Sequence, residues 1–110
     1  MPRPSRNEVV VIMWRDIPAQ VNGQSGRDRH QVALAPRFQR AIDRAKRKAR
    51  IVTAHEDVAQ WRRVSTPCTG DVAAAADAAA RQLEREYTER RLGAISYNGG
   101  FEHAADPVEN

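Results

Sequence analysis

The chain lacks most of the features that reveal a function in a sequence. It has one cysteine, Cys68, so it can form neither an internal disulfide nor a zinc site built from cysteines alone. No segment approaches the ~18 consecutive apolar residues of a membrane helix, and none has the pattern of a secretory signal peptide. These absences argue against membrane and secreted proteins, and we expect a soluble, cytoplasmic protein.

Residues suited to metal binding or catalysis are also sparse. The histidines, His30, His55 and His103, are far apart and have no His-x-x-x-His or His-x-x-Glu spacing. Cys68 has only His55 as a helix-borne general base, so an inert thiol is the favoured interpretation. Paired carboxylates suitable for acid–base chemistry are absent from the apolar segments. We therefore predict no catalytic residues, no metal site and no cofactor.

The chain is short, basic and poor in aromatic residues. Its 110 residues suffice for one domain, and its charge of +4 with a pI of about 10.0 favours acidic partners, such as nucleic acid or an acidic protein. Only 5% of the residues are aromatic, so the core depends on a few large side chains. The candidates are Trp14, Phe38, Ile42, Trp61 and Leu83. A core this small makes docking onto a partner, or oligomer formation, plausible.

The first half of the chain predicts strands followed by a helix. A β-branched run indicates a strand over Glu8–Trp14, and alternation predicts a second over Ala19–Gln24 with one face exposed to water. His30–Ala35 fits either a third strand or the approach to a helix. Pro36 suits a first helical turn, and apolar residues from Phe38 to Ala49 follow one helical face.

The second half predicts two more helices. Thr53 and Glu56 form a capping box for a short helix that carries Trp61 and ends at Arg62-Arg63. A breaker segment, Ser65–Gly70, follows. A longer helix is expected from Asp71 to Leu92, with Gly93 as its C′ residue.

Together these elements predict an α+β fold in which a two- or three-stranded antiparallel sheet packs against two to three helices. Residues 1–7 are expected to form a flexible arm, residues 8–95 a single domain, and residues 96–110 a disordered acidic tail.

Two surfaces are candidates for binding. Trp14, Arg15 and Asp16, with Gln20, lie where the first strand ends and could hold a protein partner. The structural alternative has Asp16 accepting turn N–H groups, Arg15 pairing with it and Trp14 filling the core. A third possibility is that Arg15 or Asp16 completes an enzyme site by contacting an anionic cofactor such as a folate.

The second surface is the basic helix near residues 37–50. Its cations Arg40, Arg44, Arg47 and Lys48 could contact phosphates in a nucleic-acid-binding module. No aromatic residue is interleaved with them for base stacking, which favours a solvated basic face.

Parts of the chain resemble a known family. Over roughly residues 9–64, the chain resembles the small bacterial "virulence factor" domain family. The resemblance is carried by Val11–Val21, Arg37-Phe38, Ala41–Ala45 and Trp61-Arg62-Arg63. The alanine-rich segment and the acidic end lie outside the matching pattern. The resemblance implies a stand-alone accessory or interaction domain, with a one-carbon or folate enzyme as a partner, and it brings no catalytic residues.

Overall fold

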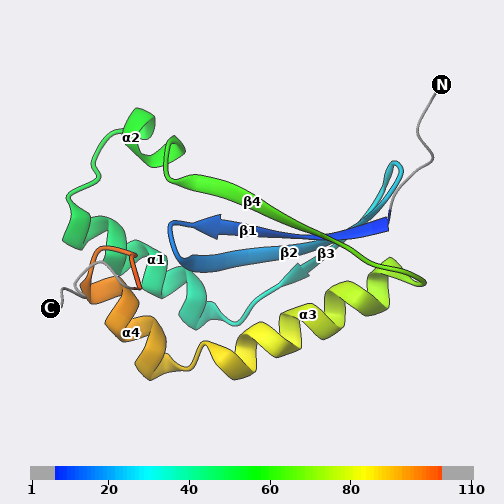
Figure 1. Ribbon diagram of the computed structural model, residues 1–110. Coiled ribbons are helices and arrows are strands. Elements are labelled where there is room, and N and C mark those ends of the chain that lie inside the picture. Colours follow the sequence, from blue (N-terminus) through cyan, green and yellow to red (C-terminus); the bar gives the residue numbers. More distant parts are fainter. Residues whose placement is uncertain (1–6, 103–110) are drawn as a thin grey trace, which may run out of the picture.

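The computed structural model describes residues 7–102, which form a four-stranded antiparallel sheet and four helices (Figure 1). The strands are β1 (Asn7–Trp14), β2 (Ile17–Ser25), β3 (Asp28–Ala33) and β4 (Trp61–Pro67), arranged in the order β3-β2-β1-β4. The helices are α1 (Pro36–Ala49), α2 (Ala54–Val58), α3 (Val72–Glu86) and α4 (Glu89–Tyr97). The predicted α+β class is confirmed.

The helices α1, α3 and α4 lie together on one face of the sheet, and α2 lies at its end beside the start of β4 (Figure 1). At Gly23 the sheet and α3 approach so closely that a Cβ atom would lie 2.4 Å from the carbonyl oxygen of Val72. Because side chains alternate along a strand, Gln20, Asn22 and Gln24 must point away from the helices. The polar residues share one face, as predicted, but that face is not open to water throughout, because Asn22 is only 3% exposed.

Two clusters of buried side chains form the core. One joins the turn end of the β1–β2 hairpin to α1 and α4, and it contains Trp14, Ile17, Phe38, Ala41, Ile42, Ala45, Leu92 and Ile95. The other joins the sheet to α3 through Val9, Val21, Ala76 and Ala80. Strict alternation from Val9 would turn Trp14 to the opposite face. A register irregularity between Ile12 and Met13 changes the alternation, and Trp14 reaches α1.

The segment after α2 is a strand, so the prediction that Trp61, Arg62 and Arg63 belong to a helix is wrong. β4 pairs along the whole of β1, from Glu8 opposite Pro67 to Trp14 opposite Trp61. The sheet thus has one strand more than expected, and the segment 65–67 of the predicted breaker belongs to it. Pairing with the free edge of β1 decides the conformation of a segment that has no helical stripe of its own. The alternative of a third strand is realised in β3, which ends before Leu34.

The long helix predicted from Asp71 to Leu92 is two helices. Asp71 is the N-cap of α3, as predicted, but that helix ends at Glu86. Thr88 begins α4, because its side-chain oxygen accepts a hydrogen bond from the Arg91 N–H. Gly93 is therefore an interior residue of α4 and not a C′ residue.

The chain end departs from the expected boundaries. α4 continues through Tyr97, and Ser96 is buried, so the expected disordered segment does not begin at residue 96. Gly99 and Gly100 have φ values of +72° and +101° and turn the chain back toward β1. Asn7 opens β1. The expected arm over residues 1–6 and the remaining tail over residues 103–110 lie outside the described residues.

Candidate functional site

The aromatic residue of the predicted partner-binding corner is fully buried. Trp14 is 0% exposed and packs among core residues of α1. Its Nε1 donates a hydrogen bond of 2.8 Å to Asp57 Oδ1 of α2. Since the indole has both an apolar environment and a hydrogen-bond partner, its place in this fold is structural. A partner has no access to it.

Arg15 is also held within the protein. Its Nε donates to Gln60 Oε1 and its Nη1 donates to the carbonyl oxygen of Gly99, both at 2.9 Å. The guanidinium carbon lies 4.4 Å from the ring centroid of Phe101 and 5.1 Å from that of Trp14. The backbone of Arg15 has a φ of +52°, which is unfavourable for any residue with a side chain. The contacts of Arg15 therefore also hold a strained turn in place.

Asp16 connects the turn to the segment that follows α4, residues 98–102, which we call the C-terminal strap. Its backbone N–H donates to the carbonyl oxygen of Gly100, and its Oδ2 accepts from the N–H of Glu102, both at 2.9 Å. Its Oδ1 lies 3.4 Å from Nη2 of Arg62. The Asp16 carboxylate therefore bonds to segments distant in sequence and not to the N–H groups of its own turn, and Arg15, expected to pair with it, bonds to Gln60 and Gly99.

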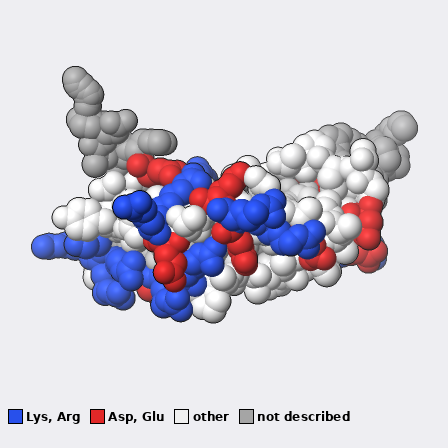
Figure 2. Space-filling model, turned by 90° about the horizontal axis from the view of Figure 1, so that it is seen from below, with Lys and Arg blue, Asp and Glu red and all other residues white. Residues whose placement is uncertain are grey.

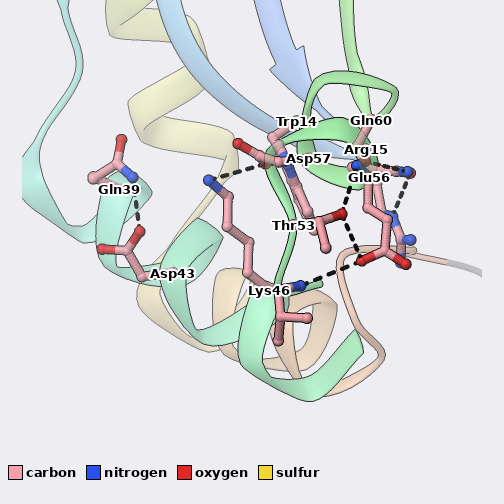
Figure 3. A network of polar contacts seen from close by, with 10 residues as sticks. Trp14, Arg15, Gln39, Asp43, Lys46, Thr53, Glu56, Asp57 and Gln60 are labelled. Atoms are coloured by element: carbon pink, nitrogen blue, oxygen red, sulfur yellow. Dashed lines mark hydrogen bonds and ion pairs between the residues drawn. The ribbon is translucent and has the colours of Figure 1, made fainter. Parts of the chain in front are cut away.

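A polar network links α1, α2 and the corner (Figure 3). Lys46 reaches from α1 to Asp57, with Nζ 3.1 Å from Oδ1, and lies 5.8 Å from the ring centroid of Trp14 and 5.6 Å from that of Trp61. Desolvation alone would raise the pKa of Asp57, but the hydrogen bonds from Lys46 and Trp14 outweigh it and lower the pKa below its usual 3.8. The charged form of Asp57 is the form that fits this network.

Asp57 should make the free energy of unfolding depend on pH in the acidic range. A carboxylate with a lowered pKa stabilises the folded protein above its unfolded pKa, and that contribution is lost as the pH falls through the folded pKa. We expect the free energy of unfolding of the wild type to fall more steeply between about pH 5 and pH 3 than that of Asp57→Asn. Urea unfolding followed by circular dichroism at several pH values measures this. Equal slopes in the two proteins would contradict the assigned role, and Asp43→Asn, on the exposed face of α1, is the matched control.

Gln20, the fourth residue predicted at the corner, does not share these contacts. Its Nε2 donates a hydrogen bond of 3.1 Å to Oδ1 of Asn22 on the polar face of the sheet. The four residues thus separate into three that build the corner and one on another surface.

The predicted cations of α1 face solvent. Arg40, Arg44, Arg47 and Lys48 are all exposed, and lysines and arginines gather over the end of the molecule formed by α1 and α4, on the left of Figure 2. Within residues 7–102, the side chains of Arg40 and Arg47 have no hydrogen bond or ion pair. Lys48 lies 4.4 Å from the ring centroid of Tyr97, which is 70% exposed. We call this region the α1–α4 surface.

Within that surface, α1 and α4 enclose a cavity of about 300 Å³. Its lining is Arg37, Arg40, Ala41, Arg44, Glu89, Leu92 and Gly93. Arg37 is already bound within the protein, because its guanidinium donates hydrogen bonds to the carbonyl oxygens of Glu84 and Tyr87 at the end of α3. Arg44 has only a long contact of 3.5 Å to Ser96 Oγ. The head groups of Arg40 and Arg44 are therefore available at this cavity.

Sequence patterns indicated Arg40 and Arg44 but missed the rest of this site. Glu89, Leu92 and Gly93 were assigned to the end of one long helix, and Tyr97 to a disordered tail. The signal that could have revealed them is Thr88, a good N-cap residue that precedes a helix of its own.

The remaining candidates do not converge on one another within residues 7–102. His30 Nε2 lies 3.3 Å from Asp77 Oδ1, and His55 is exposed on α2, while His103 lies outside the described residues. Cys68 is half-buried against the α3 cluster. Over residues 7–102, no group of three or more metal-ligating side chains converges, and no helix is long and apolar enough to cross a bilayer.

Comparison with known proteins identifies a family. The sequence profile of a family described as "Virulence factor" matches residues 12–95. Comparisons with the curated proteins and with the solved structures find no match. The profile begins within β1 and ends within α4, so it contains the corner, α1 and the part of α4 that lines the cavity. On its C-terminal side it extends well beyond the resemblance over residues 9–64. By this match over most of its length, the chain belongs to the virulence factor family.

Proposed function

We propose that the protein is a non-enzymatic docking domain that binds an acidic protein partner on the α1–α4 surface. The observation that carries this proposal is the exposed Arg40 and Arg47 of α1, whose side chains have no partner within residues 7–102, next to a cavity with two available arginine head groups. The corner predicted from sequence is a weaker candidate, because Trp14 is buried and Arg15 is bonded internally. Arginines are typical anchoring residues at protein interfaces.

The mixture of charges favours a protein over a nucleic acid. Asp43 lies among the cations of α1, and Glu89 lines the cavity. Carboxylates at these places would repel a phosphate backbone, whereas a protein surface can offer charges of both signs in register. A one-carbon or folate enzyme, the partner that the family resemblance implies, is the first protein to test.

Nucleic-acid binding is the second candidate, and one observation favours it. Tyr97 is largely exposed beside Lys48, so the basic surface does have an aromatic ring at its margin. A single-stranded nucleic acid could stack a base there while its phosphates contact α1.

A pair of charge-reversal variants tests the proposal. Binding of a hexaglutamate peptide and of an oligothymidylate of equal charge is measured by calorimetry at low and moderate salt. We expect Arg40→Glu/Arg47→Glu to weaken peptide binding by about tenfold or more, because close interfacial charge pairs contribute on the order of 1.5 kcal/mol or more each.

Arg29→Glu/Arg81→Glu is the matched control, since it changes the net charge equally on β3 and α3. Equal losses in the two double variants would mean nonspecific attraction and would contradict the proposal. Preferred binding of the oligothymidylate, lost in Tyr97→Ala, would establish the second candidate in its place.

A further inference from the structure

The cavity between α1 and α4 has the shape and chemistry of a site for one acidic side chain. On α1, Arg37, Arg40 and Arg44 are spaced three and four residues apart and so lie along one helical face. On α4, Glu89, Leu92 and Gly93 form the facing wall. Ala41 and Leu92 beneath the arginines belong to the buried core, because each is only 2% exposed.

Gly93 is the unusual residue of this wall. Glycine in a helix interior destabilises the protein relative to alanine, so it needs a reason to be there. Close packing is not that reason, because a Cβ atom built at Gly93 would meet no atom within 4 Å. Nor is backbone conformation, because Gly93 is absent from the glycines that have positive φ. A side chain at this position would, however, occupy space that belongs to the cavity.

The charges around the cavity suit a carboxylate. Arg40 has no partner within the described residues, and Arg44 only the long contact to Ser96. Each guanidinium can donate two parallel hydrogen bonds to a carboxylate. Arg37 adds positive charge from a fixed position, and the three arginines together outweigh the single negative charge of Glu89 on the facing wall.

The geometry points to a specific anchoring site, which rests on the proposed function: Gly93 keeps open a cavity in which Arg40 and Arg44 bind a glutamate or aspartate side chain of the partner. The rest of the α1–α4 surface, including Arg47 and Lys48, then contributes attraction at longer range. Binding energy is concentrated at the cavity and not spread evenly over the cations.

Filling the cavity without changing the charge is the sharpest test. Calorimetry at fixed moderate salt measures binding of the hexaglutamate peptide to Gly93→Leu, Arg44→Gln and Arg47→Gln. We expect Gly93→Leu and Arg44→Gln each to weaken binding about tenfold, and Arg47→Gln, which removes the same charge outside the cavity, about twofold. Thermal unfolding verifies that each variant is folded, and Arg40→Gln replaces any variant that is not.

The outcomes separate this inference from the proposed function. If Gly93→Leu binds like the wild type, and Arg44→Gln and Arg47→Gln lose equally, the surface binds the peptide but the cavity does not, and only the anchoring site is overturned. If the wild type fails to bind the peptide even at low salt, the proposed function fails and the anchoring site fails with it.

Discussion

Replacement of Trp14 by alanine is expected to cost the protein most of its stability. Deleting a fully buried aromatic side chain typically costs about 3–5 kcal/mol, and the entire stability of a small domain is only about 5–15 kcal/mol. Trp14 is also the donor to Asp57 and lies within reach of the cations of Arg15 and Lys46. Removing it empties the centre of the cluster that joins the hairpin to α1. Urea unfolding followed by far-ultraviolet circular dichroism measures the loss.

Two other substitutions make the interpretation of Trp14→Ala specific. Trp14→Phe keeps most of the apolar volume and removes the Nε1 donor, and we expect a smaller loss of about 1–3 kcal/mol. Trp61→Ala removes the second tryptophan, which is only half-buried at the start of β4, and should also cost less. An unfolding midpoint of Trp14→Ala equal to that of the wild type would refute the structural role. Loss of partner binding in Trp14→Ala, without evidence that it is folded, would not identify a docking surface.

The second large effect is expected at Gly100. A Cβ atom there would lie 2.7 Å from Cζ3 of Trp14, and the φ of +101° is strained for any residue with a side chain. The ring cannot move aside because it is buried, so Gly100→Ala must shift the C-terminal strap away from the corner. Strain and overpacking of this kind cost about 1–3 kcal/mol each. We expect thermal unfolding at a clearly lower temperature.

Gly93→Ala is the control for that experiment. It makes the same chemical change in the interior of α4, where a Cβ atom meets open space. It should stabilise the protein by about 0.5–1 kcal/mol, since alanine is the better helix former. If both substitutions shifted the unfolding temperature in the same direction, the close packing of Gly100 on Trp14 would not hold. Hydrogen exchange at the N–H groups of Asp16 and Glu102 would report directly whether the strap has moved.

The corner explains why a polar cluster at a strand end is ambiguous in a sequence. Trp14, Arg15 and Asp16 have the composition of a hot spot, and the same composition serves to clamp distant segments together. Their partners are Asp57, Gln60 and residues 99–102, which lie about 40 to 90 residues further along the chain. Alternation and spacing describe neighbours in the sequence, so they cannot reveal that a strap covers the corner.

Local order was readable from the residues alone. The β-branched run of β1, the apolar stripe of α1 after Pro36, and the caps Thr53 and Asp71 each specify their own conformation, because backbone sterics, side-chain periodicity and capping act within a few residues. The basic face of α1 follows from the same periodicity. Even the family resemblance rested on short local motifs.

The long-range features required the folded chain. β4 is a strand because β1 offers it a free edge. At the end of α3, the Arg37 guanidinium donates hydrogen bonds to the carbonyl oxygens of Glu84 and Tyr87. The cavity depends on how α4 packs against α1, and the burial of Trp14 depends on Gly100 returning from the far end of the chain. Such contacts are chosen by the total free energy of packing, to which residues far apart in sequence contribute together, and no local pattern encodes that sum.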